Sequence, residues 1–410
     1  MPGKGTVLTP MAFAALMATT LATAIGNTGL ISVMPAVGRE LGISDFLVAG
    51  IFSLSALMWA IASPYWARRS DRTSRKPYIL LGLCGFIFSM IGCGLVVLAG
   101  AAAMAGPLAL FLAFLVVRSS YGVFGSAAAT AAQAYIAEHS EGAARVKAVA
   151  GLAGALSLGT VLGPALAPFL ILPPAGLASP MFLFGLGGAV ILLLVALALP
   201  QDRAAGSFGA AQEPSSTHSI WRDAAVRPFL IYAFVLSSAQ AANTYTLGFL
   251  VIDRLGLEPV AAQGAIGAAM VASAVAALAA QWGLIVPLGL RPRTMLRWGG
   301  ALAVLGNALV VMLPGYGSLV VAYAIASLGY GLARPGFTAG ASLAAASSRQ
   351  GAVAGAISSI AGASIVVPPV IAVGLYQLDR SAPFILLVVL LAGLCAYASF
   401  SPALAQNYER

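Results

Sequence analysis

The stretch ARRSDRTSRKP, Ala67–Pro77, separates two apolar segments of more than twenty residues each. Its eleven positions carry five positive charges and one acid. Lys and Arg gather in the cytoplasmic loops of membrane proteins, so this pattern predicts a short cytoplasmic turn between two membrane-spanning helices. The stretch therefore also orients the rest of the chain.

The composition extends this interpretation to the whole chain. Of its 410 residues, 60% are hydrophobic and only 8% are charged, whereas about a quarter of the residues in soluble domains are charged. The length allows about a dozen membrane crossings of about 20 residues each. A net charge of +9 fits orientation in a bilayer, and we expect no nucleic-acid partner. The three cysteines lack CxxC spacing, so neither a disulfide framework nor a metal site is expected. We expect no cofactor.

Twelve apolar segments, bounded by charges, Pro or Gly, are expected to span the membrane. The first one follows Lys4 and imitates a secretory signal, but it continues to about Pro35 and is expected to be an uncleaved helix. The segments are about 10–36, 45–66, 78–100, 107–136, 147–171, 180–200, 227–252, 260–288, 297–314, 317–344, 350–376 and 382–404.

The distribution of charge predicts which side each connection occupies. With cytoplasmic termini, 16 of the 21 Lys and Arg residues fall on the cytoplasmic side, and only Arg39, Arg254 and Arg380 fall opposite. The positive-inside rule favours this orientation. We therefore predict a multi-pass protein of the bacterial cytoplasmic (inner) membrane with both termini in the cytoplasm. The other two arginines, Arg118 and Arg334, lie inside spans, and Arg334 is placed to snorkel toward the headgroups.

Residues 201–226 form the longest polar connection and have the Gly, Ser and Pro content of a flexible linker. They divide the chain into an N-terminal bundle, 1–200, and a C-terminal bundle, 227–410. A repeat supports this division, because VAGLAGALSLGTVLGPALAP from Val149 is similar to VAGAISSIAGASIVVPPVIA from Val353 at a constant offset of 204 residues. The predicted fold is all-α, with twelve transmembrane helices in two pseudo-symmetric six-helix bundles.

The opening stretch resembles the loop between helices 2 and 3 of major facilitator superfamily transporters, whose usual pattern is G-x-L-x-D-R-x-G-R-K. Ala67 and Ser74 replace the two glycines, and the charged positions correspond to Asp71, Arg72, Arg75 and Lys76. The resemblance implies a conformational latch in which the carboxylate of Asp71 accepts hydrogen bonds from a helix N-terminus or an Arg. The alternative is a solvated loop that only sets the topology.

Two further motifs resemble those of the drug and proton antiporter branch of that superfamily. VVRSSYGVFGSAA places Arg118 four residues before Gly122, similar to the R-x-x-x-G pattern of helix 4. The following segment carries Gly159, Gly163 and Pro164, similar to the glycine-rich helix 5 motif. Glycines four apart let another helix approach closely, and Pro164 permits a bend.

Arg118 is expected about 16 Å into the membrane, where a charge is costly unless it faces a cavity or a partner. The alternative is an Arg held by backbone carbonyls without a substrate role. Other polar residues far from helix ends complete the candidate substrate site, unless they only bond neighbouring helices. The candidates are Asn27, Arg118, Tyr121, Gln240, Asn243 and Thr244.

The acidic residues depart from the antiporter pattern. All twelve lie in loops or near helix ends, and helix 1 offers Asn27 where several drug antiporters of the family carry a carboxylate. Proton coupling normally uses a desolvated carboxylate that can load and release a proton. The remaining candidates for that role are Asp45, Glu138 and Asp253.

Two transport functions are therefore open. The first is proton-coupled, multidrug-type export of small, mainly hydrophobic compounds by alternating access. The second is a facilitator or symporter of a small anionic solute, with Arg118 as the anion partner. A membrane enzyme or receptor is disfavoured, because HExxH and GxSxG motifs are absent from the sequence. We expect a monomer in the bilayer, with a small molecule and in the first case protons as partners.

Overall fold

The computed structural model describes residues 8–140, 142–200, 220–346 and 349–405, which are almost entirely helical. Within these ranges the extended structure is limited to an isolated bridge between Leu172 and Gly176. The helices are α1 (Pro10–Glu40), α2 (Asp45–Asp71), α3 (Lys76–Ala101), α4 (Pro107–His139), α5 (Gly142–Leu166), η1 (Ala167–Leu170), α6 (Ser179–Ala198), α8 (Arg227–Leu255), α9 (Gln263–Leu278), η2 (Ala279–Ile285), α10 (Val286–Leu288), α11 (Pro292–Met312), α12 (Tyr316–Ala344), α13 (Gln350–Val366), α14 (Pro368–Leu378), α15 (Ala382–Phe400) and α16 (Pro402–Ala405).

All twelve predicted spans correspond to long helical segments, which confirms the all-α membrane fold. Among the described residues, eleven helical segments are long and apolar enough to cross a bilayer. The twelfth, α8, has sufficient length, but Gln240, Asn243 and neighbouring hydroxyl residues make it too polar to qualify on composition. More than half of α8 is nevertheless buried, so packing within the protein compensates for its polarity.

Prolines mark several helix boundaries. Pro10 and Pro107 lie in the first turns of α1 and α4, where their fixed φ and missing N–H group fit a helix start. The hydroxyl of Thr9 accepts a hydrogen bond from the Ala12 N–H and caps α1. The one span predicted over 350–376 is interrupted at Val367, because Pro368 and Pro369 lack the N–H groups that would continue the hydrogen bonds of the helix.

A second predicted span is also interrupted, and neither interruption was predicted. The span expected over 260–288 is regular in α9 but changes to a π-helix in η2 before it ends in α10. Such widened turns are rare and often lie at functional positions. In the C-terminal unit, η2 packs against α12, where a Cβ on Gly331 would lie 3.0 Å from Cβ of Ala280 in η2.

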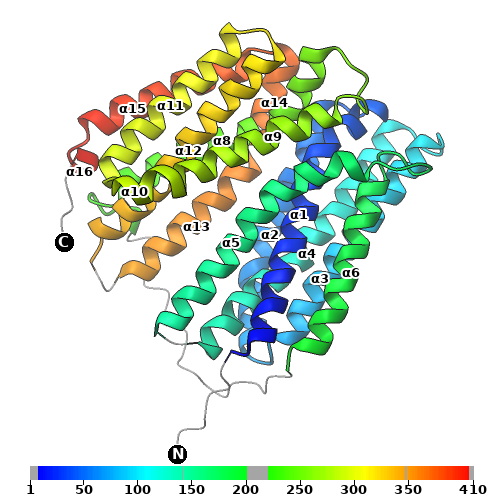
Figure 1. Ribbon diagram of the computed structural model, residues 1–410, viewed down its shortest axis with the longest axis horizontal. Helices are drawn as coiled ribbons and strands as arrows, with labels where there is room; N and C mark the ends of the chain where they lie inside the picture. The colour runs from blue at the N-terminus through cyan, green and yellow to red at the C-terminus, as the bar shows by residue number, and fades with distance from the viewer. Residues whose placement is uncertain (1–7, 141, 201–219, 347–348, 406–410) are drawn as a thin grey trace, which may run out of the picture. The chain divides into compact units, whose positions relative to one another are not determined.

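The chain separates into two compact units, and each is an all-helical bundle (Figure 1). One contains the described residues of Met1–Phe208 with Pro259–Gly267, and the other those of Gly209–Glu258 with Ala268–Arg410. The same packing order recurs in both: α3 packs on α4 and α6 as α11 packs on α12 and α15, and α1 packs on α5 as α8 packs on α13 and α14. This recurrence agrees with the duplicated fold expected from the repeat. Most of the predicted linker, residues 201–219, lies outside the described residues, and the boundaries 1–200 and 227–410 stay a prediction.

Candidate functional site

Arg118 is the charged residue buried deepest within a span of the N-terminal unit. It lies on α4, eleven residues after Pro107 and so about 16 Å along the helix, and its exposed fraction is 2%. Its Nη2 donates a hydrogen bond to Oδ1 of Asn27 on α1. The guanidinium carbon lies 4.5 Å from the ring centre of Tyr121 and 5.6 Å from that of Phe52. The structure thus brings together the three candidates predicted in this half.

An aromatic shell, formed by Phe52, Trp59, Phe86 and Tyr121, lies on one side of this cation, and Phe52 and Tyr121 contact it directly. The ring of Tyr121 lies 5.5 Å from that of Trp59 on α2 and 5.8 Å from that of Phe86 on α3, measured between centroids. The cation–π contacts of Arg118 with the rings of Tyr121 and Phe52 are of a type that contributes about 0.5–2 kcal/mol each. Phe52 and Phe86 were not predicted as site residues. The seven-residue spacing of Phe52 and Trp59, which places both on one face of α2, was the available signal.

Close approach of α2 to α4 positions Arg118. The hydroxyl of Ser55 donates a hydrogen bond of 3.0 Å to the Arg118 carbonyl. A Cβ atom on Gly122 would lie 2.9 Å from Cβ of Met58 and overlap the carbonyl oxygen of Ser55. The glycine of the R-x-x-x-G pattern therefore lets the α2 backbone pack closely on α4. Arg118, one turn before this glycine, consequently lies against α1 and α2.

The helix 5 motif has the packing role expected from its spacing. A Cβ on Gly163 would lie 2.5 Å from the carbonyl oxygen of Ile25 and 2.7 Å from the amide nitrogen of Gly29, both on α1. Gly159 likewise faces the α1 backbone, and its carbonyl accepts a hydrogen bond of 3.1 Å from the Thr28 hydroxyl. Beyond Pro164 the helix narrows into the 3₁₀ turn η1. The motif holds α1, and therefore Asn27, against α5.

The three carboxylates considered for proton coupling all lie at helix ends and form ion pairs. Asp45 lies 2.8 Å from Arg39, Glu138 pairs with Arg75, and Asp253 lies 3.4 Å from Arg380. Asp253 also accepts a hydrogen bond from Tyr376 on α14. Every described Asp and Glu lies in a connection or within two residues of a helix end. Their role in proton coupling stays a prediction.

The C-terminal unit contains an uncharged polar cluster at Asn243. Its Nδ2 donates a hydrogen bond of 3.0 Å to the hydroxyl of Tyr330 on α12, which also accepts one of 3.1 Å from Asn307 on α11. All three side chains are almost fully buried. One turn further along α8, the Thr246 hydroxyl lies 3.3 Å from that of Tyr323. Asn307, Tyr330 and Tyr323 were not predicted, because a single polar residue in an apolar helix does not reveal its partner.

Gln240 and Thr244 do not join this cluster. The Thr244 hydroxyl donates to the Gln240 carbonyl at 2.9 Å, and both side chains are only half-buried. Gln240, Asn243 and Thr244 stand three and four residues apart, a spacing that predicts a shared helix face. In the structure Asn243 is buried in the bundle and the other two side chains are only half-buried. A substrate-binding role for each stays a prediction.

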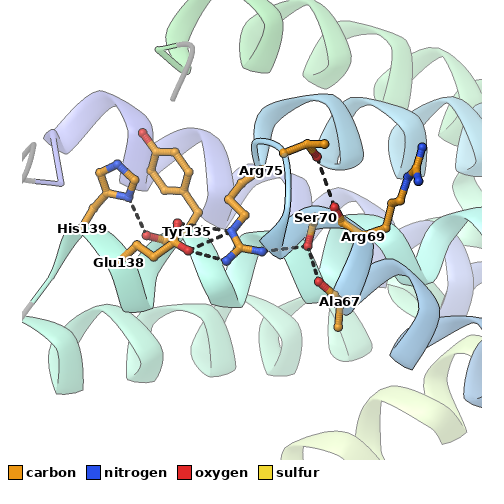
Figure 2. A network of polar contacts seen from close by, with 8 residues as sticks. Ala67, Arg69, Ser70, Arg75, Tyr135, Glu138 and His139 are labelled. Carbon is orange, nitrogen blue, oxygen red and sulfur yellow. Dashed lines mark hydrogen bonds and ion pairs between the residues drawn. The ribbon is translucent and has the colours of Figure 1, made fainter. Parts of the chain in front are cut away.

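The loop between α2 and α3 is held by Arg75 (Figure 2). Its guanidinium bonds to the carboxylate of Glu138 at the end of α4 and donates a 2.9 Å hydrogen bond to Ser70, whose hydroxyl bonds to the Ala67 carbonyl. Only 8% of the Arg75 side chain is exposed, which favours a strong pair. This ties the loop to α4.

The other three predicted latch residues have different surroundings. Nζ of Lys76 donates two hydrogen bonds of 2.6 Å to the carbonyls of Ala196 and Leu199 and so caps the end of α6. Arg72 is exposed after the last turn of α2. Asp71 ends α2, but its side chain lies outside the described part of the structure, so its predicted role as hydrogen-bond acceptor stays a prediction. Among the described residues, His, Cys, Asp and Glu form no group that could hold a metal ion.

Comparison with known families gives one match over most of the chain. The model of the Major Facilitator Superfamily matches residues 16–369. No curated protein matches the sequence significantly.

Solved transporter structures share the fold at low sequence identity. A bacterial homolog of the human lysosomal transporter Spinster, in an inward-facing and occupied conformation, has a TM-score of 0.74 at 11% identity, covering 95% of this chain and 96% of its own. A POT family transporter in complex with a thioalcohol-conjugated peptide has a TM-score of 0.74 at 13% identity, with 99% of both chains covered. The human organic anion transporter MFSD10 (TETRAN) has a TM-score of 0.64 at 19% identity, covering 94% and 98%. These likenesses show the fold alone.

Proposed function

Because the chain belongs to the major facilitator superfamily, whose model covers residues 16–369, we propose that it transports a small organic anion across the membrane by alternating access. The anionic group binds at Arg118, and the aromatic shell of Phe52, Trp59, Phe86 and Tyr121 accommodates the apolar part of the solute. This is the second of the two functions that the sequence left open.

One observation carries this proposal: a guanidinium lies deep inside a span, while every described acid lies in a connection or near a helix end. A cation at the centre of a membrane helix costs about 2.5–3.5 kcal/mol on insertion scales. The Asn27 amide and the rings of Tyr121 and Phe52 orient the guanidinium. The electrostatics of this site favour an anion and disfavour a cationic amphiphile.

The aromatic surroundings narrow the class of anion. Arg binds carboxylates, sulfonates and phosphates through its planar N–H groups while its faces stack on rings. Pockets for small molecules are lined mainly by apolar and aromatic side chains with few polar groups. The site therefore favours an anion with an aromatic or apolar body, and the shared fold with an organic anion transporter is consistent with this.

The test compares matched ligands on the purified protein. Benzenesulfonate keeps its charge at all working pH values, and benzenesulfonamide is its neutral counterpart of similar shape. We expect benzenesulfonate to raise the melting temperature of the wild-type protein and benzenesulfonamide not to. The shift should vanish in Arg118→Ala and persist in part in Arg118→Lys, because Lys keeps the charge but loses the planar fork. An unaltered shift in Arg118→Ala would refute the proposal.

Proton-coupled export of hydrophobic compounds is the second candidate. It is favoured by Gly159 and Gly163, which belong to a sequence that resembles the antiporter motif and which pack on α1. Its test is accumulation of hydrophobic dyes in everted vesicles with and without a protonophore. If dye uptake is lost when the proton gradient is collapsed, and benzenesulfonate does not change the melting temperature of the protein, proton-coupled export would replace the anion proposal.

A further inference from the structure

The start of α11 carries a concentration of positive charge. Arg291 is the N-cap residue, Arg293 and Arg297 follow it in the helix, and the first turn contains no acidic residue. The N-terminus of a helix already carries a partial positive charge from the helix dipole, so a cation there is disfavoured unless an anion lies nearby. No acid close in the sequence is available, because residues 259–378 contain no Asp or Glu.

The helix α3, which packs in the N-terminal unit as α11 does in the C-terminal unit, also begins beside two cations, and both have protein partners. Arg75 pairs with Glu138, and Lys76 donates to the last carbonyls of α6. The ion pairs between described residues include neither Arg293 nor Arg297. The buried Nε of Arg293 has no hydrogen-bond partner among them either. The start of α11 therefore has the cations of its counterpart without a described counter-charge for these two.

An exposed apolar face continues from these arginines along α11. Trp298, Leu305 and Met312 are 65%, 47% and 73% exposed. They lie within about 40° of one another on a helical projection of about 100° per residue. A different side of the helix, with Gly299 and Gly306, packs closely on α12, so the apolar face lies outside that contact.

An anionic phospholipid has the matching distribution of charge and apolar surface. The rise from Arg297 to Leu305 is about 12 Å, which is close to half of a hydrocarbon core about 30 Å thick. Trp298 follows the arginine directly, and Trp is enriched at the boundary between headgroups and acyl chains. Arg binds phosphate oxygens through paired N–H groups of its planar fork. A phosphate bound at Arg297 therefore allows an acyl chain to lie on the apolar face.

We propose that this face of α11 binds an anionic phospholipid. The guanidinium groups of Arg293 and Arg297 bind its phosphate, and an acyl chain lies along Trp298, Leu305 and Met312. A zwitterionic phospholipid carries its own cation, which the arginines repel, so an anionic headgroup binds more tightly. In the predicted orientation the bound lipid belongs to the cytoplasmic leaflet. It supplies the counter-charge at the start of α11 whichever solute the protein transports.

Quenching of tryptophan fluorescence by brominated lipids tests the position of this lipid, because bromine quenches at contact. In lipid nanodiscs, the contribution of Trp298 is the difference in emission between the wild type and Trp298→Phe. At equal mole fraction, dibrominated phosphatidylglycerol should quench this contribution about twice as strongly as dibrominated phosphatidylcholine. Trp282 on η2 is the control, because it is 68% exposed but has no Lys or Arg within eight residues. Equal quenching of Trp298 by the two lipids would overturn the proposal.

A second measurement tests the headgroup contact. Native mass spectrometry of the purified protein, titrated with phosphatidylglycerol, gives the dissociation constant of the bound lipid. Arg297→Gln should raise it about tenfold, the equivalent of about 1.4 kcal/mol, and should remove the preference for phosphatidylglycerol in the quenching of Trp298. Arg380→Gln is the control, because it removes one charge from an arginine that pairs with Asp253, and it should leave the dissociation constant within about twofold of the wild type. An unchanged constant in Arg297→Gln, or an equal rise in both variants, would overturn the binding of phosphate by Arg297.

Discussion

Nε of Arg75 lies 3.1 Å from Oε1 of Glu138, so that an ion pair joins the residue before α3 to the last turn of α4. The pair spans 63 residues of sequence and fixes the charged loop to the helix that carries Arg118. Any movement of α4 during a transport cycle is therefore transmitted to the loop.

The first prediction concerns the strength of this pair. Arg75→Gln should destabilise the purified protein by about 1.5–3 kcal/mol, the usual contribution of hydrogen bonds to charged groups. Arg72→Gln is the control, because Arg72 is exposed in the same loop and its loss should change stability by less than about 0.5 kcal/mol. Thermal unfolding in detergent measures both. A double-mutant cycle with Glu138→Gln isolates the pair, and additive effects would mean that the two residues act independently.

The second prediction concerns the glycines of α5. Gly163→Ala should destabilise the N-terminal unit by about 1–3 kcal/mol, because the added methyl group meets the α1 backbone, which cannot move aside as a side chain could. Gly154→Ala on the same helix has open space around its Cβ and should be neutral or stabilising by up to about 1 kcal/mol. The melting temperatures of the two variants, compared with that of the wild type, measure these effects. Similar behaviour of both would show that α1 and α5 are less closely packed than described.

The third prediction concerns the cluster around Tyr330. Tyr330→Phe removes the oxygen that accepts hydrogen bonds from both Asn243 and Asn307, so it should cost about 1–3 kcal/mol of stability. Thr244→Val serves as the control, because its hydroxyl bonds only to the preceding turn of its own helix. The free energy of unfolding by denaturant compares them. An equal loss in both variants would contradict the buried cluster.

The fourth prediction distinguishes the two proposed substrates. Asn27→Asp places a carboxylate beside Arg118, and the resulting ion pair should weaken benzenesulfonate binding by about tenfold or more, which corresponds to about 1.4 kcal/mol. Asn27→Ala removes the same amide without adding charge and should weaken binding less. Isothermal titration of benzenesulfonate measures the difference. A weaker effect of Asn27→Asp than of Asn27→Ala would argue against an anion at Arg118.

Much of the fold could be predicted from the sequence, because the bilayer restricts the possibilities. A span needs a certain length of apolar residues, and a basic loop such as Ala67–Pro77 marks where two spans meet. The break at Val367 and the π-helix η2 were missed for different reasons. Pro368 and Pro369 were visible in the sequence but also occur inside kinked spans, whereas η2 carries no breaker residue at its start.

The candidate site was predictable only where a charged or polar residue lies within an apolar span. Arg118 was conspicuous because charge is rare at that depth, and Asn27 because it is polar in an apolar helix. Phe52 and Phe86 were not, because aromatic residues are common in spans. Tyr330 likewise gave no sign that it bonds Asn243, 87 residues away in the sequence, because that contact depends on the packing of three helices.

The polarity of α8 has a consequence for how the protein is made. The helix α8 is too polar to be stable in hydrocarbon alone. We expect it to stay in the insertion machinery until the helices that pack against it have been synthesised. Asn243 finds its hydrogen-bonding partner only when α12 emerges, after α9 and α11. We therefore expect the second half of the chain to enter the bilayer as a group, whereas the helices of the first half can each enter as they are translated.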